Sequence, residues 1–230
     1  MPELLTLKSK VELGCDRCDT CCKYRGDIRL TIKNIFDISR YLGITPGDFM
    51  DDYTHELEGQ EPERALNAVG EFQECIMYDN KKKICSINSV KPLQCVIFPL
   101  VPESIKQDYF YVKGECKCKN KNLITVNEWL NGNNNIYKKN KEVNFAWVKV
   151  IEEIQYFWDK FSDKQKLRIR KLLYKDYDFT KVNIDKDIKK NIKKIYEIIE
   201  EIENPCKVEK KQKIRKSIFG LNKHVGKREA

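Results

Sequence analysis

The sequence predicts an α+β protein in which a small cysteine-rich module containing a β-hairpin is followed by a helical extension. Nine of the ten cysteines lie within the first 118 residues. Runs of aromatic and branched residues flank a polar turn within residues 72–87, which is typical of a hairpin. Beyond residue 125, apolar residues recur at helical spacing. These observations predict three parts: a cysteine-cluster domain (1–124), a helical extension (125–206) and a flexible basic tail (207–230).

Two short helices are predicted early in the chain. Thr31 is a favourable N-cap, and apolar residues follow it at helical spacing until Gly43 ends the helix. Thr45 and Pro46 supply the cap and the first position of the second helix. Residues 54–70 are polar and rich in turn-forming residues, so we expect a surface loop there.

The middle of the chain predicts strands. Residues 72–78 and 83–87 are rich in β-forming side chains and are joined by a polar turn. This hairpin would place Cys75 and Cys85 on two adjacent strands. Residues 108–112 predict a further strand.

The extension predicts helices. Thr125 is a cap for a short helix, and residues 132–135 predict a turn. A longer helix then carries an apolar face over residues 143–161, and Ser162 begins another. The last helix carries isoleucines over residues 188–202. Aromatic residues at helical spacing are typical of a protein core, so we expect this segment to be a helical cover.

The cysteines are the residues most indicative of chemistry. Four of them fall within residues 15–22, which is denser than packing requires, because a buried cysteine that fills space needs no neighbouring thiols. A two-residue gap lets a tight turn aim two sulfurs at one metal ion. Cys206 stands apart and is expected to be an incidental thiol. The candidate metal ligands are Cys15, Cys18, Cys21, Cys22, Cys75, Cys85, Cys95, Cys116 and Cys118.

The order of these residues resembles a known family. The run Cys-x2-Cys-x2-Cys-Cys is followed by Cys75, Cys85 and the segment Pro92-x2-Cys95-x2-Phe98-Pro99. This pattern, over residues 13–118, resembles the YkgJ-type cysteine-cluster family (CxxCxxCC), described as zinc- or iron-chelating. The family is similar to the cysteine-rich part of flagellin lysine N-methylases. The resemblance therefore implies metal binding, and it alone implies a methyltransferase-like enzyme as an alternative.

The chain departs from the family pattern at three positions. Members commonly show Tyr, Arg and Arg where this chain has Asn88, Lys91 and Val96. A lysine and a valine cannot reproduce the planar, bidentate contacts of arginine with an anion. The only histidines are His55 and His224, and no glycine-rich phosphate loop is present, so the sequence names no catalytic residue.

The spacing of the first thiols favours an iron-sulfur cluster, of the 4Fe-4S type, as the cofactor. Cys15, Cys18 and Cys21 reproduce the first three ligands of a ferredoxin-type run. Zinc is the alternative, although zinc sites usually pair two separate Cys-x2-Cys hooks. Neighbouring side chains diverge, so we expect Cys22 to face the later thiols in a second site. A single site with Cys22 as buried filler is the other possibility.

The net charge of the chain and its distribution indicate which kinds of partner to expect. The net charge is +9, and residues 207–230 carry nine basic and two acidic residues. A nucleic-acid-associated factor using this tail is a second alternative, but Phe219 is the only aromatic residue there, so a solvated tail is favoured. We expect an unknown protein or small-molecule partner instead. The chain has no apolar run long enough to span a bilayer and no signal-peptide pattern, so we expect a cytoplasmic protein with no membrane partner.

Overall fold

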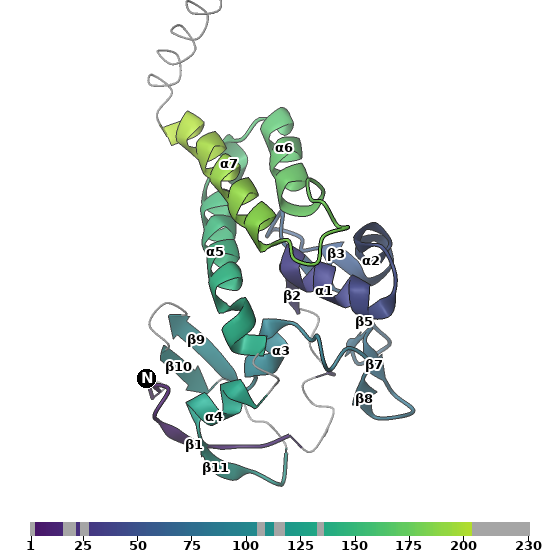
Figure 1. Cartoon of the computed structure of the whole chain (residues 1–230), viewed down its shortest axis with the longest axis vertical. Coiled ribbons are helices and arrows are strands. Elements are labelled where there is room, and N and C mark those ends of the chain that lie inside the picture. The colour runs from purple at the N-terminus through teal and green to yellow at the C-terminus, as the bar shows by residue number, and fades with distance from the viewer. Residues whose placement is uncertain are drawn as a thin grey trace, which may run out of the picture.

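The chain has an α+β fold, as predicted, with seven α-helices and several small antiparallel sheets among the residues described. The helices α5, α6 and α7 gather in the upper part of Figure 1, and most of the strands lie below them. The computed structural model describes residues 3–15, 22–23, 28–104, 109–112, 118–132 and 136–203.

Two N-terminal helices begin and end where the sequence predicts. In α1 (Ile32–Leu42), the Thr31 hydroxyl accepts the Asn34 backbone N–H at 3.2 Å. The following Gly43 has a φ of 72°, the left-handed conformation that glycine adopts without steric cost. In α2 (Pro46–Tyr53), the Thr45 hydroxyl accepts the Asp48 N–H at 3.1 Å. Both predicted caps are therefore confirmed.

The surface loop predicted for residues 54–70 is wrong, because this segment contains three strands. They are β3 (Thr54–Glu56), β4 (Arg64–Leu66) and β5 (Ala68–Val69). The central strand β4 pairs antiparallel with β3 and with β2 (Arg29–Leu30). Strands of two or three residues are too short to show an alternating pattern, and β4 also depends on β2, a partner distant in the sequence.

Two small hairpins follow this sheet. The strand β5 pairs with β6 (Glu74–Cys75), and β7 (Tyr78–Asp79) pairs with β8 (Ile84–Cys85). The turn predicted at residues 79–82 is thereby confirmed, and the structure places it at residues 80–83. Cys75 and Cys85 do not lie on adjacent strands, however, because the chain turns at residues 76–77 and begins a separate hairpin.

Three long helices form the upper part of the molecule: α5 (Ile136–Tyr156), α6 (Asp163–Tyr174) and α7 (Asp185–Glu203). As predicted, Ser162 caps α6 through a capping box with Gln165. The helix predicted to continue to Phe161 ends at Tyr156. A 3-10 turn over Trp158–Lys160 reverses the chain and keeps its aromatic neighbours buried, which explains why the apolar pattern outlasts the helix.

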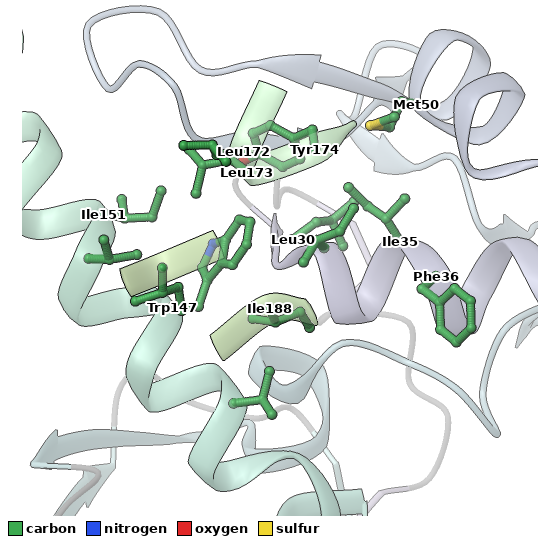
Figure 2. Packing of buried hydrophobic residues seen from close by; sticks show 14 of the residues in the cluster. Leu30, Ile35, Phe36, Met50, Trp147, Ile151, Leu172, Leu173, Tyr174 and Ile188 are labelled. Carbon is green, nitrogen blue, oxygen red and sulfur yellow. The ribbon is translucent and has the colours of Figure 1, made fainter. Parts of the chain in front are cut away.

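The main hydrophobic core joins these helices to the N-terminal segment. Trp147 of α5, Tyr174 of α6 and Ile188 of α7 pack beside Leu30 and Ile35 (Figure 2). The Trp147 and Tyr174 rings meet edge to face, with centroids 5.5 Å apart. Residues on both sides of the predicted domain boundary at 124/125 thus share one core, and the boundary itself stays a prediction.

A second, smaller core lies below the first. It packs Phe110, Leu130 and Tyr137, among others, between two sheets and two short helices. The predicted strand over residues 108–112 and the short helix capped by Thr125 are confirmed here. The elements are β1 (Lys10–Leu13) paired with β11 (Asn122–Thr125), β9 (Leu100–Ser104) paired with β10 (Tyr109–Val112), and the helices α3 (Leu93–Ile97) and α4 (Val126–Asn131).

Some predictions fall on residues that the structure does not describe. Most of the predicted turn at 132–135 and the whole basic tail at 207–230 lie outside the described residues. Within the described part of the chain, none of the helices combines the length and the apolar character needed to cross a membrane.

Two leucines on α6 test the shared core. Leu173 is fully buried in the main core, whereas Leu167 on the same helix is 56% exposed. We expect Leu173→Ala to lower the free energy of unfolding by about 2–5 kcal/mol, because it leaves a cavity in a packed core. The matched control Leu167→Ala should change it by less than about 0.5 kcal/mol. Urea unfolding measures both values, and equal losses would contradict the described packing.

The buried carboxylate of Glu63 makes stability depend on pH. Burial raises the pKa of the Glu63 carboxyl, and the Arg29 guanidinium, with Nη1 3.1 Å from Oε2, lowers it by a smaller amount. The native state then holds this proton more tightly than the unfolded chain does. Stability therefore falls as the pH rises from the unfolded pKa, about 4.3, through the raised native value.

The variant Glu63→Gln removes the free-energy cost of burying the charged carboxylate. At pH 7 we expect it to be more stable than the wild type, because no buried charge remains, and near pH 3.5 we expect the advantage to vanish. Urea unfolding at the two pH values measures the difference. The exposed Glu58→Gln serves as the control and should show no such change. A Glu63→Gln variant less stable than the wild type at pH 7 would mean that the ion pair with Arg29 outweighs the burial cost.

Candidate metal centre

One cavity of about 650 Å³ lies where the two cores meet. Ile28, Leu66 and Met77 line it from the main core, hereafter the upper core. Val96 and Trp129 line it from the second, smaller core, hereafter the lower core. All six cysteines that the structure describes also line this cavity. They are Cys15, Cys22, Cys75, Cys85, Cys95 and Cys118.

The first two of these cysteines are placed by close backbone contacts. Gly14 lies so near the carbonyl oxygen of Asn120 that any Cβ at this position would clash with it. This approach brings Cys15, just after β1, beside the segment that contains Cys118. The carbonyl oxygen of Cys22 accepts the Cys75 N–H at 2.8 Å, which ties the N-terminal thiols to the first hairpin.

Cys75 and Cys85 come from two copies of one ten-residue hairpin. The repeat spans residues 67–76 and 77–86. In each copy the last N–H is bonded to the first carbonyl: Ile76 donates to Asn67 at 3.0 Å, and Ser86 donates to Met77 at 2.9 Å. The cysteine stands at the ninth position of both copies.

Both hairpin loops also share an unusual backbone conformation. Gln73 and Lys83, two residues before each cysteine, have φ values of 51° and 54°. These are the only non-glycine residues with positive φ that the structure describes. The regular ten-residue spacing of Cys75, Cys85 and Cys95 is the sequence signal that could have predicted the repeat.

Cys95 is held by the short helix α3. Its N–H donates to the carbonyl oxygen of Pro92 at 2.9 Å, so the proline starts the turn that carries the thiol. The indole Nε1 of Trp129 donates to the carbonyl oxygen of Ile97 at 3.3 Å. This bond fixes α4 against α3, and both helices contribute to the cavity wall.

The remaining four cysteines are three candidate ligands and the expected incidental thiol Cys206. Cys18, Cys21, Cys116 and Cys206 lie outside the described residues. Among the residues that are described, no three His, Cys, Asp or Glu side chains converge closely enough to hold a single metal ion. The structure thus brings Cys15 and Cys22 to the same cavity, while their division between one or two metal sites stays a prediction.

The cavity wall also contains polar residues that the sequence did not identify as site residues. Three of them are Lys83, Asn88 and Lys91. All three positions that depart from the family pattern thus line the cavity: Asn88 and Lys91 are polar, and Val96 is apolar and buried. Glu128 lines it as well. A backbone hydrogen bond from Thr125, and a second from its hydroxyl, lower the pKa of the Glu128 carboxyl and hold it in the helix cap.

The fold and the cavity define a cysteine-cluster protein, in which several short elements present thiols to one internal space. Residues 14–129 match the model of the CxxCxxCC family, described as a "Putative zinc- or iron-chelating domain". The chain therefore belongs to this family, whose description supports metal binding through its cysteines. Searches of curated proteins and of solved structures found no match.

The left-handed loop residues provide a test of the hairpin geometry. We expect Gln73→Gly to stabilise the protein by up to about 1 kcal/mol, because glycine adopts positive φ without a Cβ clash. Gln73→Val should destabilise it by about 1–2 kcal/mol. Glu71→Gly, in the same loop but at negative φ, is the control and should not stabilise. Urea unfolding measures all three, and stabilisation by both glycine variants would argue against the described loop.

Proposed function

We propose that this chain binds an iron-sulfur cluster, of the 4Fe-4S type, through cysteine thiolates. The observation that carries the proposal is that six cysteines from separate segments line one cavity. Hydrophobic packing offers no reason for thiols to gather in this way, since a buried cysteine packs equally well beside leucine or valine. The ligands would come from the set Cys15, Cys18, Cys21, Cys22, Cys75, Cys85, Cys95, Cys116 and Cys118.

The donor set fits an iron-sulfur cluster. Such clusters are held mainly by cysteine thiolates, and six thiols are present in the described wall. His55, the only histidine among the described residues, lies on β3 and does not line the cavity. When bound, a cluster of this type would supply one-electron transfer.

The spread of the cysteines favours a cluster over zinc. A zinc ion draws its four sulfurs to within about 3.8 Å of one another, because each Zn–S bond is about 2.3 Å long. The described cysteines line one cavity from separate segments, and among the described residues no three donors lie close enough together to hold one ion. A four-iron cluster tolerates wider separation, because each cysteine binds a different iron. The Cys15-x2-Cys18-x2-Cys21 spacing supports the same choice.

We further propose that the protein works in the cytoplasm. Ten cysteines in a reducing compartment remain available as thiolate ligands, whereas an oxidising compartment would convert them to disulfides.

Anaerobic purification tests the cluster directly. We expect a brown protein with broad absorption near about 400 nm and about four irons per chain. Cys75→Ser and Cys85→Ser should each lose about half or more of the iron, because a hydroxyl is a much poorer ligand for iron than a thiolate. Iron and zinc are measured together by elemental analysis of the same samples.

Cys206→Ser is the matched control, since this residue stands outside the family pattern, and it should keep its full metal content. A colourless protein with stoichiometric zinc would show that the thiol site binds zinc and not an iron-sulfur cluster. Alkylation of nearly all cysteines in the native protein, with no release of metal, would refute metal binding altogether.

A further inference from the structure

The cavity is larger than a metal group requires. A structural zinc site is closed, because four protein ligands fill the coordination sphere. If each of the eight heavy atoms of a 4Fe-4S core takes the volume of one water molecule, roughly 30 Å³, the core occupies on the order of 240 Å³. More than half of the cavity of about 650 Å³ would then stay open. That remainder lies within the range of small-molecule pockets, about 300–1,000 Å³.

The wall of this space contains both polar and apolar residues, as ligand pockets do. Asn88 and Lys91 lie in the short stretch between β8 and α3, and Lys83 lies in the turn between β7 and β8. Asn88 is exposed and Lys91 is partly buried, so this stretch runs from the surface into the cavity wall. Trp129, on α4, supplies an aromatic wall that its hydrogen bond to Ile97 holds in place.

The Lys91 side chain is the polar group best suited to hold a ligand. Within the described part of the chain, no ion pair or hydrogen bond engages its ammonium. A lysine ammonium is positively charged at neutral pH and strongly favours a negatively charged partner when partly buried. The one carboxylate described in the wall, Glu128, is already bonded to Thr125 in the cap of α4.

We propose that the open part of this cavity binds a small organic anion, a carboxylate or phosphate on an apolar body, with Lys91 holding the charged end. This inference rests on the proposed function, because it places the ligand beside the metal group. Four thiolates on a 4Fe-4S core with a charge of +2 leave a net charge of −2, so an anion beside the cluster needs the Lys91 ammonium as a direct partner. The anion is then held by a directed, charge-assisted hydrogen bond and by aromatic contact rather than by a general positive field.

Three small probes of similar shape test the site on metal-loaded protein under anaerobic conditions. Benzoate and phenyl phosphate carry the two kinds of anion on an aromatic body, and benzamide is the neutral counterpart. We expect at least one anion to bind with a Kd of about 1 mM or lower and benzamide to bind about tenfold or more weakly. Ligand-observed NMR titration gives the three values, and the preferred anion identifies the headgroup.

The lysine variants then locate the binding. Lys91→Met should weaken binding of the preferred anion by about tenfold or more and leave benzamide unchanged. Lys81→Met removes the same charge from the nearby hairpin loop, outside the cavity wall, and should leave all three affinities unchanged. The proposal is overturned by benzamide binding as tightly as the anions, by Lys91→Met binding like the wild type, or by no saturable binding up to about 20 mM.

Metal analysis of the same samples separates this proposal from the cluster proposal. Anion binding that depends on Lys91 in a protein holding zinc would support the anion site and refute the iron-sulfur assignment. Iron-loaded protein that binds neither anion would support the iron-sulfur assignment and overturn the anion site. A Lys91→Met variant that shifts the reduction potential while keeping anion affinity would make Lys91 a charge partner of the cluster and overturn its role as a ligand anchor.

Discussion

The structure depends on one continuous helix that enters both hydrophobic cores. The first turn of α5 buries Ile136 and Tyr137 in the lower core, and the next turns bury Val143, Trp147 and Ile154 in the upper core. Because an α-helix is stiff over this length, it sets the distance between the two cores. The cavity lies at their junction, so the separation that α5 maintains between the cores also separates the walls of the cavity.

The cysteines themselves stand on weak local elements. The strands β6 and β8 are two residues long, and α3 has five residues, so none of them would be stable alone. The strand β6 is held by the backbone hydrogen bond between Cys75 and Cys22, and α3 is held by the hydrogen bond from the Trp129 indole to Ile97. A metal group bound by thiolates from these segments would cross-link them, and its binding energy would then contribute directly to folding.

Each error in the sequence-based prediction has an identifiable physical origin. The strands β3 and β4 were missed because a pair of two- or three-residue strands gains its stability from its partner rather than from its own residues. Cys75 and Cys85 were assigned to one hairpin because the turn at residues 76–77 has no glycine or proline to mark it. The end of α5 was placed too late because Phe157 and Phe161 stay buried in the turn that follows.

The sequence by itself determined the α+β class, the caps at Thr31, Thr45, Thr125 and Ser162, and the membership of a thiol-rich family, because caps, helical periodicity and cysteine spacing are local properties of the chain. Only the tertiary structure decided which cysteines face one space and which polar residues join them there. Trp129 is far from Cys22 and Cys75 in the sequence, and all three line one cavity only because the two cores meet there. Such long-range contacts leave no periodic trace in a single sequence.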